Sequence, residues 1–248
     1  MSKRLKRCFV VVFIGGLVAV CFLPALFDAR AEILPVKTYT AADGLPRDAV
    51  WKVRQDARGF LWFCTSEGLV RFDGYSFKLY GKEEGLPLRG AVDFLQARDG
   101  TYWIGTKAGL MRFNPGGVPG QGQQIGQGRA MFTFIEMEPL PPQPKFGREV
   151  NQIYEDPQGT IWVTMEDGLN KLVEEQGRTF LRRIDLPNSN KLGYLPMHDM
   201  LKDRRGNLWV GTDHGPQHNY STLYQIRPDG KIGRHDILLG AVNALLEA

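Results

Sequence analysis

A tryptophan recurs four times along this chain inside the same short phrase, and this repeat limits the folds that the chain can adopt. In every copy one glycine lies three residues before the tryptophan and another lies six residues after it. The steps between successive tryptophans are 41, 59 and 47 residues. Repeats of roughly 40–50 residues, each built around one tryptophan-containing strand, are typical of β-propeller blades. The tryptophans are Trp62, Trp103, Trp162 and Trp209, the first glycines are Gly59, Gly100, Gly159 and Gly206, and the second glycines are Gly68, Gly109, Gly168 and Gly215.

Each copy predicts four antiparallel strands. In the first copy, residues 56–59 begin with Asp and end with Gly, as a type I turn prefers, and residues 60–65 form an aromatic-rich strand. A hairpin at Gly68, a strand over 69–72 and an outer strand over 75–80 follow. The strand before the turn is marked by paired apolar residues, which are Val50 and Val53, Ala91 and Phe94, Val150 and Ile153, and Met197 and Met200.

The tryptophan strand is apolar on both faces, as expected for a sheet packed between two neighbours. We therefore predict that the four tryptophans pack between blades and do not bind a ligand. The carboxylates at the recurrent turns are expected to cap those turns, and not to catalyse. The residue two positions after each tryptophan is small, which is expected to leave room for a large ring; these residues are Cys64, Gly105, Thr164 and Gly211.

The chain starts and stops partway through this pattern. Residues 36–39 align with the outer strand 77–80, and residues 241–248 align with residues 49–56 and then stop. Propellers commonly close their ring by letting the two termini share a blade. We therefore predict an all-β fold, a β-propeller of four-stranded antiparallel blades over residues 32–248, with about four and a half blades and an incomplete ring. The chain would be the N-terminal part of a longer protein or a truncated product.

The second blade carries an insertion. Residues 114–130 are rich in Gly and Gln and predict a mobile surface loop between its third and fourth strands. Residues 131–137 predict the fourth strand, and the proline-rich residues 139–146 predict an extended connector. A tolerated surface insertion is the simplest interpretation of the loop, and a partner-binding role is the alternative.

Residues 1–31 form a separate element. Basic residues precede an apolar run over 8–27, and Ala29-Arg30-Ala31 has the pattern of a signal-peptide cleavage site. The segment predicts a signal peptide or an N-terminal membrane anchor, so the repeats are expected on the periplasmic side of the bacterial inner membrane. The remaining residues carry 26 basic and 26 acidic side chains and therefore give no electrostatic case for nucleic-acid binding. Cys64 is the single cysteine left, so no internal disulfide is expected.

No catalytic constellation is visible. The sequence lacks G-x-S-x-G, a phosphate-cradling glycine loop and H-E-x-x-H. His214 and His218 are four residues apart, but Gly215 and Pro216 between them disfavour the helix that would align them. Together with Asp213 they are weak candidates for a metal site, against the plainer interpretation as rim-loop residues. We predict no cofactor and no catalytic residue in this chain.

The repeated motif consists of Gly-Leu-Pro, a strand, and then Asp-x-x-Gly-x-Leu-Trp and Gly-Leu-x-Arg-Phe. This motif resembles the two-component regulator propeller repeat. It is clearest in residues 44–72 and 85–113, whereas the third copy departs at Met165 and the fourth at Pro216. The resemblance implies seven-bladed propellers outside the cytoplasmic membrane, followed by a transmembrane helix and most often a histidine kinase. It implies a sensor that binds an extracytoplasmic ligand such as a glycan, works with the remainder of its own receptor chain and forms a homodimer when full length.

Two other hypotheses stay open. Streptogramin-lyase-type propellers have similar repeats and place a histidine base and a metal on one face, which would make this chain an exported lyase or hydrolase. The candidate histidines for that activity are His198, His214, His218 and His235. The other hypothesis is an exported scaffold that only binds proteins, which the absence of a signalling output after the ring would favour.

Overall fold

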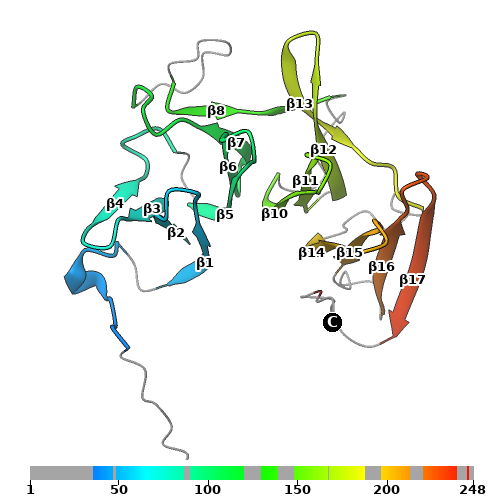
Figure 1. Ribbon diagram of the computed structural model, residues 1–248, viewed down its shortest axis with the longest axis horizontal. Coiled ribbons are helices and arrows are strands. Elements are labelled where there is room, and N and C mark those ends of the chain that lie inside the picture. The colour runs from blue at the N-terminus through cyan, green and yellow to red at the C-terminus, as the bar shows by residue number, and fades with distance from the viewer. Residues whose placement is uncertain are drawn as a thin grey trace, which may run out of the picture. The chain divides into compact units, whose positions relative to one another are not determined.

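The computed structural model describes residues 36–46, 49–86, 90–119, 130–138, 148–166, 168–187, 197–212, 220–238 and 245. The chain divides into two compact units, Met1–Thr38 and Tyr39–Ala248. In the first unit the described residues are 36–38, which form no strand. The second unit contains four sheets, each with four antiparallel strands in sequence order (Figure 1), so the propeller prediction is confirmed.

The strands follow the order that the repeat predicts. Sheet 1 contains β1 (Val50–Gln55), β2 (Leu61–Thr65), β3 (Leu69–Phe72) and β4 (Phe77–Tyr80). Sheet 2 contains β5 (Ala91–Gln96), β6 (Tyr102–Thr106), β7 (Gly109–Phe113) and β8 (Phe132–Phe134). Sheet 3 contains β10 (Val150–Glu155), β11 (Ile161–Met165), β12 (Gly168–Glu175) and β13 (Arg178–Arg183), and sheet 4 contains β14 (Met197–Lys202), β15 (Leu208–Thr212), β16 (Tyr220–Ile226) and β17 (Ile232–Leu238).

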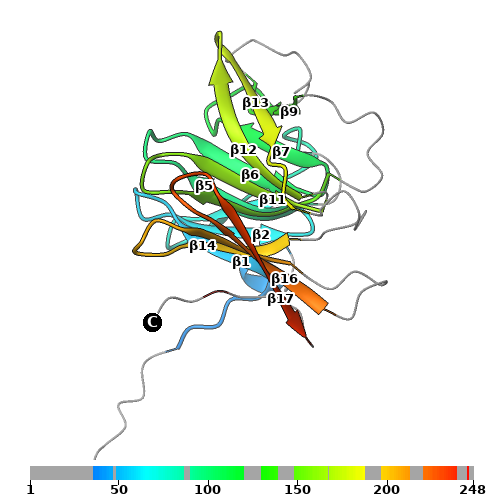
Figure 2. The same ribbon diagram turned by 90° about the vertical axis from the view of Figure 1, so that its right-hand side faces the viewer.

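The prediction of a single fourth strand over 131–137 is wrong. Residues 132–134 pair with β7 as β8, but β9 (Glu136–Met137) pairs in parallel with β13 and adds a fifth strand to sheet 3. The side chains explain the division, because Phe132 is buried between sheets 1 and 2 whereas Met137 is buried with the residues of sheets 2 and 3. The long β12–β13 hairpin that receives β9 is visible in Figure 2.

Residues 36–40 pair with no described strand. The outer strand over 36–39 is expected to find its partner strands at the closing C-terminal blade, so it stays a prediction. Thr40 caps a short 3₁₀ helix, η2 (Ala41–Asp43), that follows residues 36–40. The Asp43 carboxylate accepts a hydrogen bond from the Thr40 amide at 2.8 Å, which completes a capping box. The Gly81 amide donates to Glu84 in the same way at 2.8 Å, so the Gly-Leu-Pro phrase follows a turn of the same kind both times.

Successive sheets bury their apolar faces against each other. The first strands β1, β5, β10 and β14 lie next to one another (Figure 1), and three clusters of buried side chains fill the spaces between neighbouring sheets. In the first cluster the ring of Trp62 stacks on Phe94 of sheet 2, with centroids 4.8 Å apart. Each interface therefore repeats the contact between a tryptophan strand and the first strand of the next sheet.

A backbone contact accompanies this packing. A first strand has one edge without a partner strand, and its outward-facing amides need acceptors. The Ile153 amide donates to the Asp93 carboxylate of the preceding sheet at 2.8 Å, and the Met200 amide donates to Gln152 at 2.6 Å. The Leu245 amide donates to Asp199 at 2.6 Å in the same way. Every first strand has a register shift just before the residue in this position, which turns that side chain toward the next sheet.

At the interface between sheets 1 and 2, the equivalent position forms an ion pair in place of a hydrogen bond to an amide. Lys52 occupies the acceptor position of sheet 1 and cannot accept a hydrogen bond, so its ammonium pairs with Asp93 at 3.2 Å. The Arg54 guanidinium lies 3.5 Å from the other oxygen of that fully buried carboxylate. Asp93 therefore holds sheet 1 through two cations and sheet 3 through one amide.

Gly105, the small residue two positions after Trp103, has a different role from the predicted one. A Cβ atom on Gly105 would lie 2.6 Å from Val150 of the next sheet. The first strand of the neighbouring sheet, and not an aromatic ring, occupies the space beside Gly105. Close approach of two strands, and not ring packing, therefore requires glycine here.

Candidate functional site on the turn face

The turns between the first and second strands of the four sheets form one side of the propeller, which we call the turn face. It comprises residues 56–59, 97–100, 156–159 and 203–206. In three of these turns the leading aspartate accepts hydrogen bonds from the backbone amides two and four residues later, for example from Arg58 and Phe60 to Asp56. The glycine that ends each turn has a positive φ of 82–87°, which a residue with a Cβ rarely adopts.

The same aspartates also hold the tryptophans. The indole nitrogens of Trp62, Trp162 and Trp209 donate to Asp56, Asp156 and Asp203 over 3.0, 3.1 and 2.8 Å. Burial alone favours the protonated carboxyl of Asp203, but hydrogen bonds from Asn207 and Trp209 lower its pKa to about 2. Burial opposes ionisation of Asp56 and Asp156 as well, and their hydrogen bonds again lower the pKa. The leading aspartates are therefore anionic anchors that join the turn to the strand.

Sheet 2 lacks this anchor. Ala97 stands six residues before Trp103, where the other three sheets have aspartate. The indole nitrogen of Trp103 is buried and has no acceptor among the described residues. Asp99 instead accepts the Thr101 amide at 2.8 Å and leaves the indole unsatisfied.

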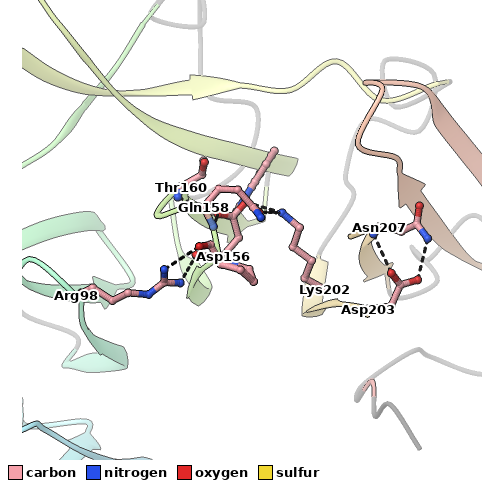
Figure 3. A network of polar contacts seen from close by, with 9 residues as sticks. Arg98, Asp156, Gln158, Thr160, Lys202, Asp203 and Asn207 are labelled. Carbon is pink, nitrogen blue, oxygen red and sulfur yellow. Dashed lines mark hydrogen bonds and ion pairs between the residues drawn. The ribbon is translucent and has the colours of Figure 1, made fainter. Parts of the chain in front are cut away.

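Polar side chains connect neighbouring turns across the turn face (Figure 3). Arg98 reaches the turn of Asp156 from one side, where it donates to the carbonyl oxygens of Asp156 and Pro157. Lys202 reaches it from the other side, with its ammonium 3.0 Å from the Asp156 carboxylate and a second hydrogen bond to Gln158. One turn of sheet 3 is therefore tied to both neighbouring sheets.

A depression of about 890 Å³ opens on the turn face beside sheet 2. Its lining includes two arginines, Arg58 from the turn of sheet 1 and Arg112 from β7. Tyr102 fixes the first of these, because its hydroxyl accepts from Arg58 at 2.9 Å and donates to Asp56 at 3.0 Å. Burial and the bond to Asp56 raise the pKa of Tyr102, so the phenol stays protonated. The volume falls within the range of small-molecule pockets.

The structure places most of the repeat residues but not the candidate metal residues. Trp62 and Trp103 are buried and Trp162 is half-buried, and these three belong to the packed clusters between sheets. Trp209 is half-buried and contacts Asp203 and His235 of its own sheet. Asp213, His214, Gly215 and His218 lie outside the described residues, as does the side chain of His198. His235 on β17 lies 5.8 Å from the Trp209 ring, and the described part of the chain contains no group of three or more side chains suited to hold a metal.

Other predicted segments also lie outside what is described. These are residues 1–35, which contain the predicted signal or anchor, residues 120–129 of the insertion, the connector over 139–146 and most of 241–248. Sequence reasoning missed the depression, because Arg58 and Arg112 are 54 residues apart, which is more than one repeat, and belong to different sheets. The described residues include no helix with the length and apolar character of a membrane span.

Comparison with known proteins agrees with the fold. Residues 145–167 and 191–214 match the family model described as two component regulator propeller, so the chain carries repeats of this kind. These segments fall in the third and fourth copies, which depart more from the phrase than residues 44–72 do. A histidine kinase of Formosa agariphila is 39% identical over 59 residues, which are 24% of this chain and 4% of that protein.

Two solved structures share the architecture. The extracellular domain of a hybrid two-component system from B. thetaiotaomicron matches with a TM-score of 0.57 and 18% identity, over 84% of this chain and 24% of that one. PorZ, a surface component of the type-IX secretion system of Porphyromonas gingivalis, matches with a TM-score of 0.52 and 14% identity, over 83% of this chain and 30% of that one. This chain thus spans only a small part of the length of the proteins that it matches.

We predict that Ala97→Asp stabilises the chain. The new carboxylate would accept the buried Trp103 indole N–H and the turn amides, as Asp56 does, and should raise the free energy of unfolding by about 1 kcal/mol. Urea unfolding of the purified chain measures this change, with Ala57→Asp, on an exposed position of the equivalent turn, as the matched control. An unchanged or lower free energy of unfolding in Ala97→Asp would show that the indole does not need an acceptor.

The pKa of Asp203 predicts a pH dependence. Because the folded pKa is about 2 and the ordinary value is 3.8, its stabilisation is present above the ordinary value and is lost as the pH falls through the folded one. Asp203→Asn replaces an accepting oxygen by an NH₂ group, so the variant should be less stable than the parent chain at neutral pH. The difference in free energy of unfolding should be constant down to about pH 5 and shrink toward about pH 2. A difference that persists unchanged at the lowest pH would contradict this assignment.

Proposed function

We propose that this chain is the exported, ligand-sensing propeller of a two-component signal-transduction receptor. The match of residues 145–167 and 191–214 to the two-component regulator propeller model is the observation that carries the proposal. The shared architecture with an extracellular domain of a hybrid two-component system supports it, and so does the short similarity to a histidine kinase. Residues 1–31 would deliver the propeller to the periplasmic side of the inner membrane.

The turn face supplies the means of sensing. Its side chains bridge neighbouring sheets, since Arg98 and Lys202 both bind the turn of Asp156. A ligand bound on this face contacts residues that depend on the relative position of two sheets. Such a ligand favours one arrangement of the sheets over another, and in a homodimeric receptor this preference biases the membrane helices and the histidine kinase.

The reading frame beyond the codon for Ala248 tests the proposal. We expect further repeats, then a membrane-spanning helix and a histidine kinase with its dimerisation helix. Determining the coding sequence and the length of the native transcript measures this directly. A frame that completes a propeller and stops without a membrane-spanning segment would overturn the sensor proposal and leave the enzyme and scaffold hypotheses.

A further inference from the structure

Among the described residues, the lining of the depression beside sheet 2 carries one more cation than it has carboxylates. Two arginines and one carboxylate, Asp99, contribute to its lining. The Arg58 guanidinium is partly neutralised by Asp56 at 3.9 Å, and the Asp99 carboxylate is engaged by the Thr101 amide. Arg112 is exposed and has no ion pair among the described residues. Arg112 is therefore the cation of the described lining that has no carboxylate partner.

The inserted segment provides no counter-charge. Residues 114–130 contain no Asp or Glu. The described stem of this segment, residues 114–116, lines the depression together with Ala130. An anion from solution can bind to an arginine that lies next to an insertion at the edge of a sheet and has no carboxylate partner.

The rest of the lining is polar. Thr101, Thr133, Gln96 and Asn114 present hydroxyl and amide groups around the arginines. The corresponding positions of the other sheets do not repeat this pair of guanidiniums, because the position of Arg112 is Arg71, Lys171 or Gln225 elsewhere. Arg71 lies over the Phe60 ring at 4.6 Å, whereas Arg112 is directed into the depression.

We propose that this depression binds an oxyanion carried on a hydroxyl-rich small molecule. Arg112 binds the oxyanion, Arg58 is held in place for a second contact by Tyr102, and the threonine and amide side chains bind the hydroxyl groups. The shared chemistry is that of a carboxylate, a sulfate ester or a phosphate ester, each of which a guanidinium binds through two parallel hydrogen bonds. The statement that this molecule is the signal rests on the proposed function. The binding of the molecule to the depression does not require a kinase.

The test uses the purified chain and four probes built on the same hexose ring. Glucuronate, glucose 6-sulfate and glucose 6-phosphate present the three oxyanions, and glucose is the neutral control. We expect at least one anionic probe to shift the NMR signal of the Arg112 side chain while glucose does not, and to bind more weakly as salt is added. The probe that binds best identifies the oxyanion.

Variants separate the guanidinium from general charge. Arg112→Ala should weaken binding of that probe by about tenfold or more, and Arg112→Lys should restore part of it. Arg182→Ala is the matched control, because Arg182 is a half-buried arginine on a strand that pairs with Glu175 at 2.8 Å. Unfolding curves that match the parent chain show that the Arg112 variants are folded.

Two results would overturn the assignment. One is the absence of a shift at Arg112 with all three anionic probes, and the other is unchanged affinity in Arg112→Ala. Neither result bears on the reading frame beyond Ala248, so the sensor proposal and the anion site fail independently. If the reading frame encodes a membrane-linked kinase but the depression binds none of the probes, the ligand of the sensor binds on another face.

Discussion

The unpaired edge of each first strand is the constraint on which the arrangement of the sheets depends. Its outward-facing amides need acceptors. The Phe94 amide donates to Asp93 of its own strand at 2.9 Å, whereas the preceding sheet supplies an acceptor for two of these strands. Asp93 and Gln152 do so for Ile153 and Met200, at a position that the register shift turns toward the next sheet. Tryptophan packing adds the apolar contact, but it is not directional, whereas the hydrogen bond fixes how one strand lies against the next.

The turn face extends this linkage to the surface of the propeller. Each leading aspartate joins its turn to a tryptophan, so the packed interface and the turn form one hydrogen-bonded unit. Arg98 and Lys202 then join the turn of Asp156 to both neighbouring sheets (Figure 3). The depression opens where these units meet beside sheet 2, which has an alanine in place of the anchor. A ligand bound there would act on contacts between sheets and not on one sheet alone.

The features that depend on a short local motif could be predicted from the sequence. The spacing of glycines around each tryptophan predicted the turns, the hairpins and four strands per sheet, because each depends on residues close together in the chain. The contacts between sheets could not be predicted, since the position of Lys52, Asp93, Gln152 and Asp199 has no common residue type. The crossing of β9 to sheet 3 depends on where Met137 finds a buried site, and the depression depends on two arginines brought together by the fold. The outer strand predicted over 36–39 stays a prediction, because its expected partner strands belong to the closing C-terminal blade.

Amide hydrogen exchange tests directly whether acceptors on one sheet hold the edge of the next. The account predicts slow exchange at Ile153 and Met200, whose amides donate to Asp93 and Gln152. The equivalent amide of Val53, on a half-exposed edge with no acceptor among the described residues, should exchange faster by orders of magnitude. Asp93→Ala should accelerate exchange at Ile153 while Met200 remains protected. Equal exchange at all three amides, or an unchanged rate at Ile153 in the variant, would contradict the account.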